Sequence, residues 1–224
     1  MLLTISGLLN PAQLQKIHEL LDQAPAVDGR STAGFAAARV KRNQEIQPDP
    51  KQRQLLNRIL MASLGQNETF RFGVLPHRVA DPIFSRYRSG QRYGDHVDDP
   101  IMGSSGPRFR TDVSMTIFLN EPRDYEGGEL VVRTTFGEQR LKLSAGDAVT
   151  YPASSLHHVA EVTTGERRVA LLWIQSYVRD PARRELLYEL NQARETLLHE
   201  APNAAHTALV DRSYANLVRM WSDL

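Results

Sequence analysis

His96 and Asp98 are two positions apart, and both are residue types that bind metal ions. In an extended segment, alternate side chains project from one face, so an imidazole and a carboxylate at this spacing converge on one point. A second histidine from elsewhere would complete a set of two imidazoles and one carboxylate, which binds Fe(II) and leaves coordination positions open. The His-x-Asp spacing alone is common, and a solvated histidine in a surface turn is its ordinary alternative.

A pair of adjacent histidines, His157 and His158, offers the second imidazole. Neighbouring residues on a strand face opposite ways, so only one of the two can point into a shared interior. Arg167 and Arg168 pose the same choice farther along the chain. Alternation says only that neighbours differ, and it leaves both choices open. A hydrogen-bonded histidine on an apolar strand and a solvated arginine turn are the alternatives without metal chemistry.

The motifs around these residues follow one another in a specific order between positions 78 and 179. They are Tyr87-x-x-Gly90-x-x-Tyr93-x-x-His96-x-Asp98-x-Pro100, Phe118-Leu119-Asn120, Glu126-Gly127-Gly128-Glu129-Leu130, Ala145-Gly146-Asp147, Leu156-His157, and Gly165-x-Arg167 followed by Trp173. In this order they resemble the Fe(II)- and 2-oxoglutarate-dependent dioxygenases of the prolyl/lysyl hydroxylase class. The segment from Trp173 to Asp180 is similar to the bacterial PKHD-type hydroxylases, a group that includes iron-uptake-associated members.

The resemblance implies a role for each candidate residue. In that family the distal metal ligand follows leucine and precedes one variable residue and valine, which selects His157, beside His96 and Asp98, as the third ligand. The step of six residues from arginine to tryptophan selects Arg167 as the partner of the far carboxylate of 2-oxoglutarate. A planar guanidinium suits a carboxylate because it donates two parallel hydrogen bonds. Tyr87 is expected beside Arg167 as a hydroxyl donor.

The reaction that the resemblance implies is hydroxylation of an unidentified C–H bond, with 2-oxoglutarate converted to succinate and CO2. Fe(II), 2-oxoglutarate and O2 are the expected cofactor and co-substrates, and L-ascorbate is expected to keep the iron reduced. The substrate is expected to be a peptidyl proline or lysine, or a small molecule linked to iron uptake. A non-catalytic sensor module that binds iron and 2-oxoglutarate is the alternative function. A cupin-like zinc or manganese enzyme is a third interpretation, which Arg167 disfavours because that chemistry needs no buried guanidinium.

The amino-acid composition argues against several other classes of function. With 27 basic and 26 acidic residues, the formal net charge is +1, so no global field favours nucleic acid or an anionic membrane. The chain has no cysteine, which excludes disulfides and thiolate metal sites. No apolar run approaches the roughly 18 residues of a membrane span, and the apolar opening lacks a basic leader. We therefore expect a cytoplasmic protein without a membrane or nucleic-acid partner.

The elements that must position these residues are predicted to form a mainly β core with flanking helices, in the α+β class. Short alternating segments separated by turns indicate a double-stranded β-helix, or jelly roll. We expect the dioxygenase domain over residues 78–178, an N-terminal helical region over 1–77 that packs on it, and a C-terminal helical extension over 179–224. Turn residues predict breaks at 120–124, 126–128, 136–138, 145–147 and 164–166.

Three pairs of residues mark helix starts in the flanking regions. Asn10-Pro11, Asp49-Pro50 and Asp180-Pro181 each place a capping side chain before a proline at the first helical position. The first helix is expected to run toward Pro25, and the second is expected to end near Gly65.

Some features have no assignment from the sequence. Residues 28–40 show no clear period, and the role of His158 is open. The loop over 101–107 either closes over substrate or is a plain surface loop. The apolar stripes of the C-terminal helices either cover the barrel or join copies of the chain in a homo-oligomer.

Overall fold

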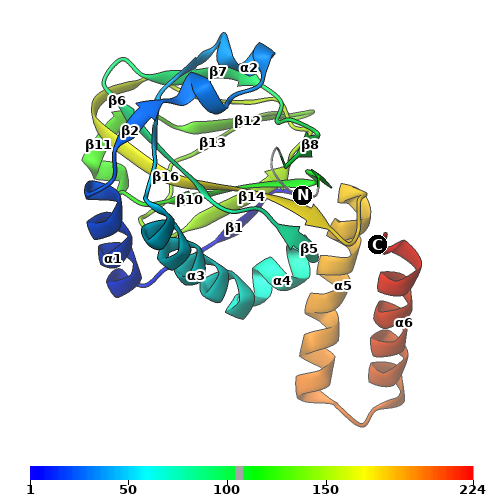
Figure 1. Ribbon diagram of the computed structural model, residues 1–224. Helices are drawn as coiled ribbons and strands as arrows, with labels where there is room; N and C mark the ends of the chain where they lie inside the picture. The colour runs from blue at the N-terminus through cyan, green and yellow to red at the C-terminus, as the bar shows by residue number, and fades with distance from the viewer. Residues whose placement is uncertain (104–107, 224) are drawn as a thin grey trace.

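The computed structural model describes residues 1–103 and 108–223, in which short strands form sheets and helices flank them (Figure 1). The strands are β1 (Leu3–Ile5), β2 (Ala26–Asp28), β3 (Lys41–Arg42), β4 (Gln44–Ile46), β5 (Pro76–Val79), β6 (Ile83–Arg88), β7 (Arg92–His96), β8 (Ile101–Met102), β9 (Phe109–Arg110), β10 (Val113–Phe118), β11 (Tyr125–Gly127), β12 (Leu130–Thr134), β13 (Gly137–Leu141), β14 (Ala148–Pro152), β15 (His157–Val159) and β16 (Val162–Ser176). The helices are α1 (Pro11–Asp22), α2 (Phe35–Ala38), α3 (Pro50–Gln66), α4 (Glu68–Val74), α5 (Pro181–Glu200) and α6 (Ala205–Trp221), with the short 3-10 helices η1 (Gly29–Thr32) and η2 (Pro122–Asp124).

Within the described residues, the strands form two main antiparallel sheets. The larger sheet has the order β1-β14-β10-β16-β6-β4-β2, and β5 and β11 also pair with β16. The smaller sheet has the order β13-β12-β15-β7-β3, and β8 pairs with β9 as a separate ribbon. This arrangement confirms the predicted mainly β jelly-roll core with flanking helices. Strands β1 to β4 precede residue 78, so the N-terminal region contributes to both sheets as well as supplying helices.

The helices α1, α3 and α5 begin at the predicted caps. The side chain of Asn10 accepts a hydrogen bond from a backbone N–H in the first turn, and Asp49 and Asp180 do the same for their helices. A proline follows each cap, where the missing N–H costs no helical hydrogen bond. Helix α4 was not predicted from the sequence, although the side chain of its cap, Asn67, also accepts a hydrogen bond from a backbone N–H in the first turn.

The larger sheet packs on both of its faces, and β10 shows the division. Every residue of β10 is buried. Met115 and Ile117 belong to the core that includes side chains of α1, α3 and α4, whereas Phe118 belongs to the core between the sheets. Because side chains alternate along a strand, Ser114 and Thr116 share the inner face with Phe118. The candidate functional residues gather on this inner side.

The predicted break at 164–166 is wrong, because β16 runs through these positions without interruption. Gly165 lies within the strand at φ +77° and pairs with Tyr125 of β11. A Cβ at Gly165 would lie 2.2 Å from the carbonyl oxygen of Asp124, so glycine permits the close approach of the two strands. Pairing with β6 and β11 therefore overrides the local turn signal.

The helices α5 and α6 form an antiparallel hairpin that projects from one end of the sheets (Figure 1). The Nε of Arg194 in α5 lies 2.6 Å from Oδ1 of Asp211 in α6 and joins the two helices. Leu186, Leu209 and Met220 are exposed on the hairpin. A homo-oligomer contact through these helices stays a prediction. None of the helices in the described part of the chain has the length and apolar character needed to cross a membrane.

The structure shows the secondary structure of residues 28–40 in full and that of the loop 101–107 in part; neither had been predicted from the sequence. Residues 28–40 contain the end of β2, the short helix η1 and the single-turn helix α2. In the loop over 101–107, residues 101–103 include β8, and residues 104–107 lie outside the described residues.

Candidate active site

The smaller sheet brings His96, Asp98 and His157 together at the inner face of the barrel. His96 ends β7 and His157 begins β15, and the antiparallel register places the two residues directly opposite each other. Asp98 follows β7 by two residues, and its Oδ1 lies 3.9 Å from Nε2 of both histidines. One ligand atom from each of the three residues lies within 4.8 Å of the other two. This set, called here the triad, could hold one metal ion between its three ligand atoms.

Backbone carbonyls orient both imidazoles of the triad. Nδ1 of His96 lies 2.8 Å from the carbonyl oxygen of Gly94, and Nδ1 of His157 lies 3.0 Å from that of Ser155. A carbonyl only accepts, so each Nδ1 carries the proton and donates it, and each Nε2 is left with its lone pair. Metal-binding histidines are commonly held in this way, which fixes the tautomer and the ring orientation.

Asp98 is held through the oxygen that does not face the histidines. The hydroxyl of Ser114, on the inner face of β10, donates to Oδ2 of Asp98 at 2.5 Å. Oδ1, the oxygen that faces the two Nε2 atoms, is thereby directed toward the centre of the triad. The carboxylate is oriented to offer one oxygen, as a facial triad requires when other coordination positions stay open.

The environment of His96 favours its neutral form. Burial, reinforced by the nearby His157, lowers the pKa of His96 to about 4. The ring of Tyr93 stacks on the imidazole at a centroid distance of 3.6 Å, and the Nζ of Lys41 lies 5.4 Å from the centre of the Tyr93 ring. Lys41 in turn forms an ion pair with Glu45, at 2.5 Å between Nζ and Oε1. Near pH 7 the imidazole is therefore neutral and available as a ligand.

His158 points away from the triad, as strand alternation requires. Its Nδ1 lies 3.0 Å from Oδ1 of Asp95, and Asp95 also forms an ion pair with Arg133 on the outer face of the smaller sheet. Of the two adjacent histidines, the structure therefore brings His157 into the site and leaves His158 in a surface network.

Arg167 lies on the inner face of β16 with its guanidinium enclosed. The residue is 1% exposed, and its Nε and Nη1 have no hydrogen-bond partner among the described residues. Gly128 makes room for it, since a Cβ there would lie 3.1 Å from Cδ of Arg167. Buried donors without partners are costly, so this cation is arranged for an anionic ligand.

Arg168 faces the opposite way and is fully engaged. Its Nε lies 2.5 Å from Oε1 of Glu166, and its Nη1 lies 2.5 Å from Oδ1 of Asp22 in α1. The choice between the two adjacent arginines therefore falls on Arg167, for the same reason that it falls on His157.

Two tyrosines lie against Arg167. The Tyr87 residue is directly opposite Arg167 in the β6–β16 register, and the guanidinium carbon lies 5.1 Å from the centre of the Tyr87 ring. Burial raises the pKa of Tyr87 to about 12, although Arg167 opposes the shift. Its hydroxyl is thus protonated and can donate. The hydroxyl of Tyr125 is also buried and has no partner within the described residues.

One cavity of about 500 Å³ connects these features. The three residues of the triad line it, and so do Arg167 and Tyr87. Trp173 and the Lys41–Glu45 pair also line it, and the indole N–H of Trp173 is buried without a partner in the described structure. The cavity is within the usual size range of small-molecule sites.

Sequence reasoning missed several residues of the site. Ser114, Lys41 and Glu45 come from strands that reach the triad only through long-range pairing, and Tyr125 reaches Arg167 in the same way. One usable signal exists for Ser114, because it and Thr116 are polar residues at alternate positions of a strand whose other residues are apolar. Lys41 directly follows the segment 28–40, which showed no clear period, and Glu45 lies four residues farther along.

Residues 82–175 match the family model of the 2OG-Fe(II) oxygenase superfamily. Over 224 residues the chain is 53% identical to a PKHD-type hydroxylase of Thioalkalivibrio sulfidiphilus, with 100% of both chains covered. Among solved structures, a Pseudomonas putida prolyl-4-hydroxylase aligns with a TM-score of 0.56 at 19% identity, covering 78% of this chain and 92% of that chain. A viral collagen prolyl hydroxylase from Paramecium bursaria Chlorella virus-1, in complex with 2OG, gives a TM-score of 0.55 at 17% identity, covering 78% and 96%. At these identities the structural likeness shows the fold alone.

Proposed function

The chain belongs to the PKHD-type hydroxylases of the 2OG-Fe(II) oxygenase superfamily, and we propose that it hydroxylates a C–H bond of a still unidentified substrate. The co-substrates are 2-oxoglutarate and O2, and the other products are succinate and CO2. One atom of O2 enters the new hydroxyl group and the other enters succinate, so that each turnover consumes one 2-oxoglutarate.

A single observation carries this proposal: the triad and the unpartnered guanidinium of Arg167 line the same cavity. A metal site alone would fit many functions, and so would a buried arginine alone. A cavity lined by three metal ligands and also by a carboxylate-binding cation fits a ligand with a chelating end and a second carboxylate. 2-Oxoglutarate has both groups.

The donor set of the triad fits Fe(II). His96 and His157 offer neutral nitrogen through Nε2, and Asp98 offers one anionic oxygen through Oδ1. Two imidazoles and one carboxylate suit this ion and leave positions for the co-substrates. When bound, Fe(II) supplies the electron-transfer chemistry that activates O2, and the protein supplies binding and orientation.

Arg167 and Tyr87 orient the co-substrate. The unpartnered N–H groups of Arg167 donate to the far carboxylate of 2-oxoglutarate in a charge-assisted pair. Tyr87, whose hydroxyl stays protonated, donates beside it. Fixing the far carboxylate directs the 2-oxo acid end toward the triad. The enclosed position of Arg167 excludes water, which strengthens the pair.

The substrate is proposed to be a peptidyl proline or lysine, or a small molecule linked to iron uptake, with L-ascorbate as the reductant that maintains Fe(II). The alternative, a non-catalytic sensor for iron and 2-oxoglutarate, would use the same residues without turnover. Formation of succinate that requires Fe(II) separates the two, since a sensor binds 2-oxoglutarate without consuming it.

The first experiment is anaerobic addition of Fe(II) and then 2-oxoglutarate, with the visible absorption spectrum recorded. We expect the metal-to-ligand charge-transfer band of a chelated 2-oxo acid. The band tests the triad and the co-substrate together. If Fe(II) binds and the band never appears, the 2-oxoglutarate part of the proposal is wrong.

A further inference from the structure

Residues 111–114 hold the short segment that carries the metal ligand Asp98. The hydroxyl of Ser114 donates to Oδ2 of Asp98 at 2.5 Å. The hydroxyl of Thr111 donates to the carbonyl oxygen of Asp99 at 2.5 Å, and the backbone N–H of Thr111 donates to that of Pro100 at 3.0 Å. Three hydrogen bonds from residues 111–114, called here the strand entry because they lead into and begin β10, therefore hold the carboxylate of Asp98 and the backbone of residues 99 and 100.

Asp112, between these donors, connects the strand entry to the end of β16. Its two carboxylate oxygens accept from Nε and Nη2 of Arg110, at 2.7 and 3.1 Å, and Oδ2 also accepts from the backbone N–H of Ser176 at 2.9 Å. The backbone of Asp112 bonds to Ile174 on one side and Ala153 on the other. Its carboxylate is 4% exposed. Asp112 thus meets β16 where that strand turns toward α5.

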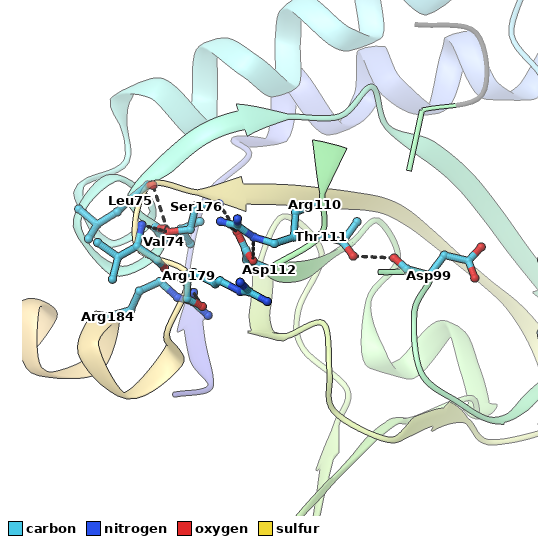
Figure 2. A network of polar contacts seen from close by, with 10 residues as sticks. Val74, Leu75, Asp99, Arg110, Thr111, Asp112, Ser176, Arg179 and Arg184 are labelled. Atoms are coloured by element: carbon cyan, nitrogen blue, oxygen red, sulfur yellow. Dashed lines mark hydrogen bonds and ion pairs between the residues drawn. The ribbon is translucent and has the colours of Figure 1, made fainter. Parts of the chain in front are cut away.

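The same end of β16 forms the base of the α5–α6 hairpin. The hydroxyl of Ser176 donates to the carbonyl oxygen of Val74 at 2.7 Å, which ties α4 to this point. Arg184, the fourth residue of α5, is buried and donates from Nη1 to the carbonyl oxygens of Val178 and Arg179, at 2.7 and 2.9 Å. Figure 2 shows this group of contacts, from Arg184 at the hairpin to the Thr111–Asp99 hydrogen bond.

Charge reinforces the connection. Burial lowers the pKa of Arg184, and the carboxylate of Asp112 is the largest influence that opposes this shift. After α6, the chain returns to the same place, where the N–H of Asp223 donates to the carbonyl oxygen of Tyr177 at 2.7 Å. The carboxylate of Asp112 therefore pairs directly with Arg110, and its negative charge favours the protonated form of Arg184.

We propose that Asp112 is a positioning residue for the metal centre: it joins the base of the C-terminal hairpin to the strand entry that holds residues 98–100, so that hairpin docking keeps Asp98 oriented as a one-oxygen ligand. Asp112 does not touch the metal or the co-substrate and acts through Thr111 and Ser114. The hairpin thereby supports the active site although it projects away from it. This role rests on the proposed metal-binding function of Asp98.

The test uses Asp112→Asn in the full chain. The variant keeps the shape and an acceptor for the N–H of Ser176, and it loses the negative charge that pairs with Arg110. Hydrogen exchange of the amides of residues 97–102 is measured first in the metal-free protein, where faster exchange is expected. Affinity for Co(II), followed by its visible absorption, is measured next, and a loss of about 10-fold is expected, as for other groups that orient metal ligands.

Thr111→Val is the second variant, because it removes the hydroxyl bond to Asp99 and leaves Asp112 and its charges in place. The same faster exchange at 97–102 is expected. The matched control is Asp211→Asn, which also breaks an Arg–Asp ion pair of the hairpin, the 2.6 Å pair with Arg194, but at a place away from the base. Neither readout should change in the control.

Two results would overturn the role of Asp112. One is unchanged exchange at 97–102 with metal affinity within twofold of the wild type. The other is an equal change in Asp211→Asn, which would mean that any loosening of the hairpin has the same effect. Failure of the proposed function looks different: the wild-type protein would then bind no Co(II), while the exchange measurement in the metal-free protein would still test the connection.

Discussion

His96 and His157 are direct cross-strand neighbours on β7 and β15, and their ring centroids lie 4.2 Å apart. Both imidazoles are buried, so a second positive charge next to the first would be strongly disfavoured. Burial and the nearby His157 lower the pKa of His96 to about 4, which keeps the His96 imidazole in the neutral form that binds metal. The same arrangement makes the fold sensitive to acid.

We predict that the metal-free protein loses stability as the pH falls from about 6.5 toward 4. The pKa of His96 is lowered from 6.5 to about 4 by burial and by His157. Between these values the unfolded chain binds the proton and the folded chain does not, so the free energy of unfolding decreases as the pH falls. The contribution of His96 is at most roughly 3 kcal/mol. Urea unfolding of the metal-free protein at a series of pH values measures it.

His96→Gln is the comparison for this pH series, because glutamine keeps a polar side chain of similar length and does not titrate. Its stability should depend less on pH between 6.5 and 4. A dependence as steep as that of the wild type would mean that His96 is not the group responsible.

Arg167→Ala is expected to weaken 2-oxoglutarate binding and to leave metal binding nearly unchanged. The guanidinium is buried with unpartnered donors, and loss of a charge-assisted pair in such a place costs about 2–3 kcal/mol. The concentration of 2-oxoglutarate that gives half of the charge-transfer band measures the effect, with Co(II) affinity as the second readout.

Arg168→Ala is the matched control for this change. The side chain of Arg168 pairs with Glu166 and Asp22 on the outer side of β16, away from the cavity. It should bind 2-oxoglutarate as the wild type does. If Arg167→Ala kept the wild-type affinity for 2-oxoglutarate and Arg168→Ala lost it, Arg168 and not Arg167 would be the residue that binds the co-substrate.

The parts of the fold that depend on short-range contacts were predictable from the sequence. Asn10, Asp49 and Asp180 each cap a helix through hydrogen bonds within one turn, so the residue type and the following proline were sufficient. Strand alternation likewise predicted that only one residue of each His-His and Arg-Arg pair points inward. The choice of His157 and Arg167 came from the resemblance to a family, and the structure places both of them in the cavity.

The parts that depend on long-range pairing were not predictable. The turn signal at Gly165 was overridden by pairing with β11. Ser114 reaches Asp98 because β10 lies in the sheet opposite β7, and no local pattern shows this contact. Lys41 reaches the triad through the pairing of β3 with β7, in which it lies opposite Tyr93. Residues that orient the ligands are therefore harder to find in a sequence than the ligands themselves.

Ser114→Ala should lower metal affinity by about 10-fold. The affinity of the metal-loaded protein for 2-oxoglutarate should change less. The substitution removes the hydrogen bond to Oδ2 of Asp98 and leaves that oxygen free to rotate toward the metal. Titration with Co(II) measures the affinity, and the coordination spectrum reports whether the carboxylate has changed its mode of binding.

Ser85→Ala provides the matched control, since Ser85 is fully buried on β6 and its hydroxyl has no partner in the described structure. Its removal should leave metal affinity unchanged. If both serine variants lose affinity equally, the effect of Ser114 would be one of packing and not of hydrogen bonding.

Lys41→Met should destabilise the protein by about 3–5 kcal/mol, because it leaves the carboxylate of Glu45 buried without its ammonium partner. The two side chains are 7% and 4% exposed, and their ion pair measures 2.5 Å. Urea unfolding at pH 7 of the metal-free protein gives the free energy. The stacked Tyr93 and His96 lie next to Lys41, so a loss of metal affinity should accompany the loss of stability.

The double variant Lys41→Met/Glu45→Gln decides whether the charge pair or the volume of Lys41 matters. Removing both charges also removes the carboxylate that has lost the ammonium group of Lys41, and buried ion pairs are often replaced in this way at little cost. We therefore expect the double variant to be more stable than Lys41→Met alone, and the double-mutant cycle to give a coupling energy well above the roughly 1 kcal/mol of an exposed pair. If the double variant were as unstable as the sum of the two single variants, the pair would contribute no interaction, and its place in the cavity wall would reflect packing of the lysine stem against Tyr93.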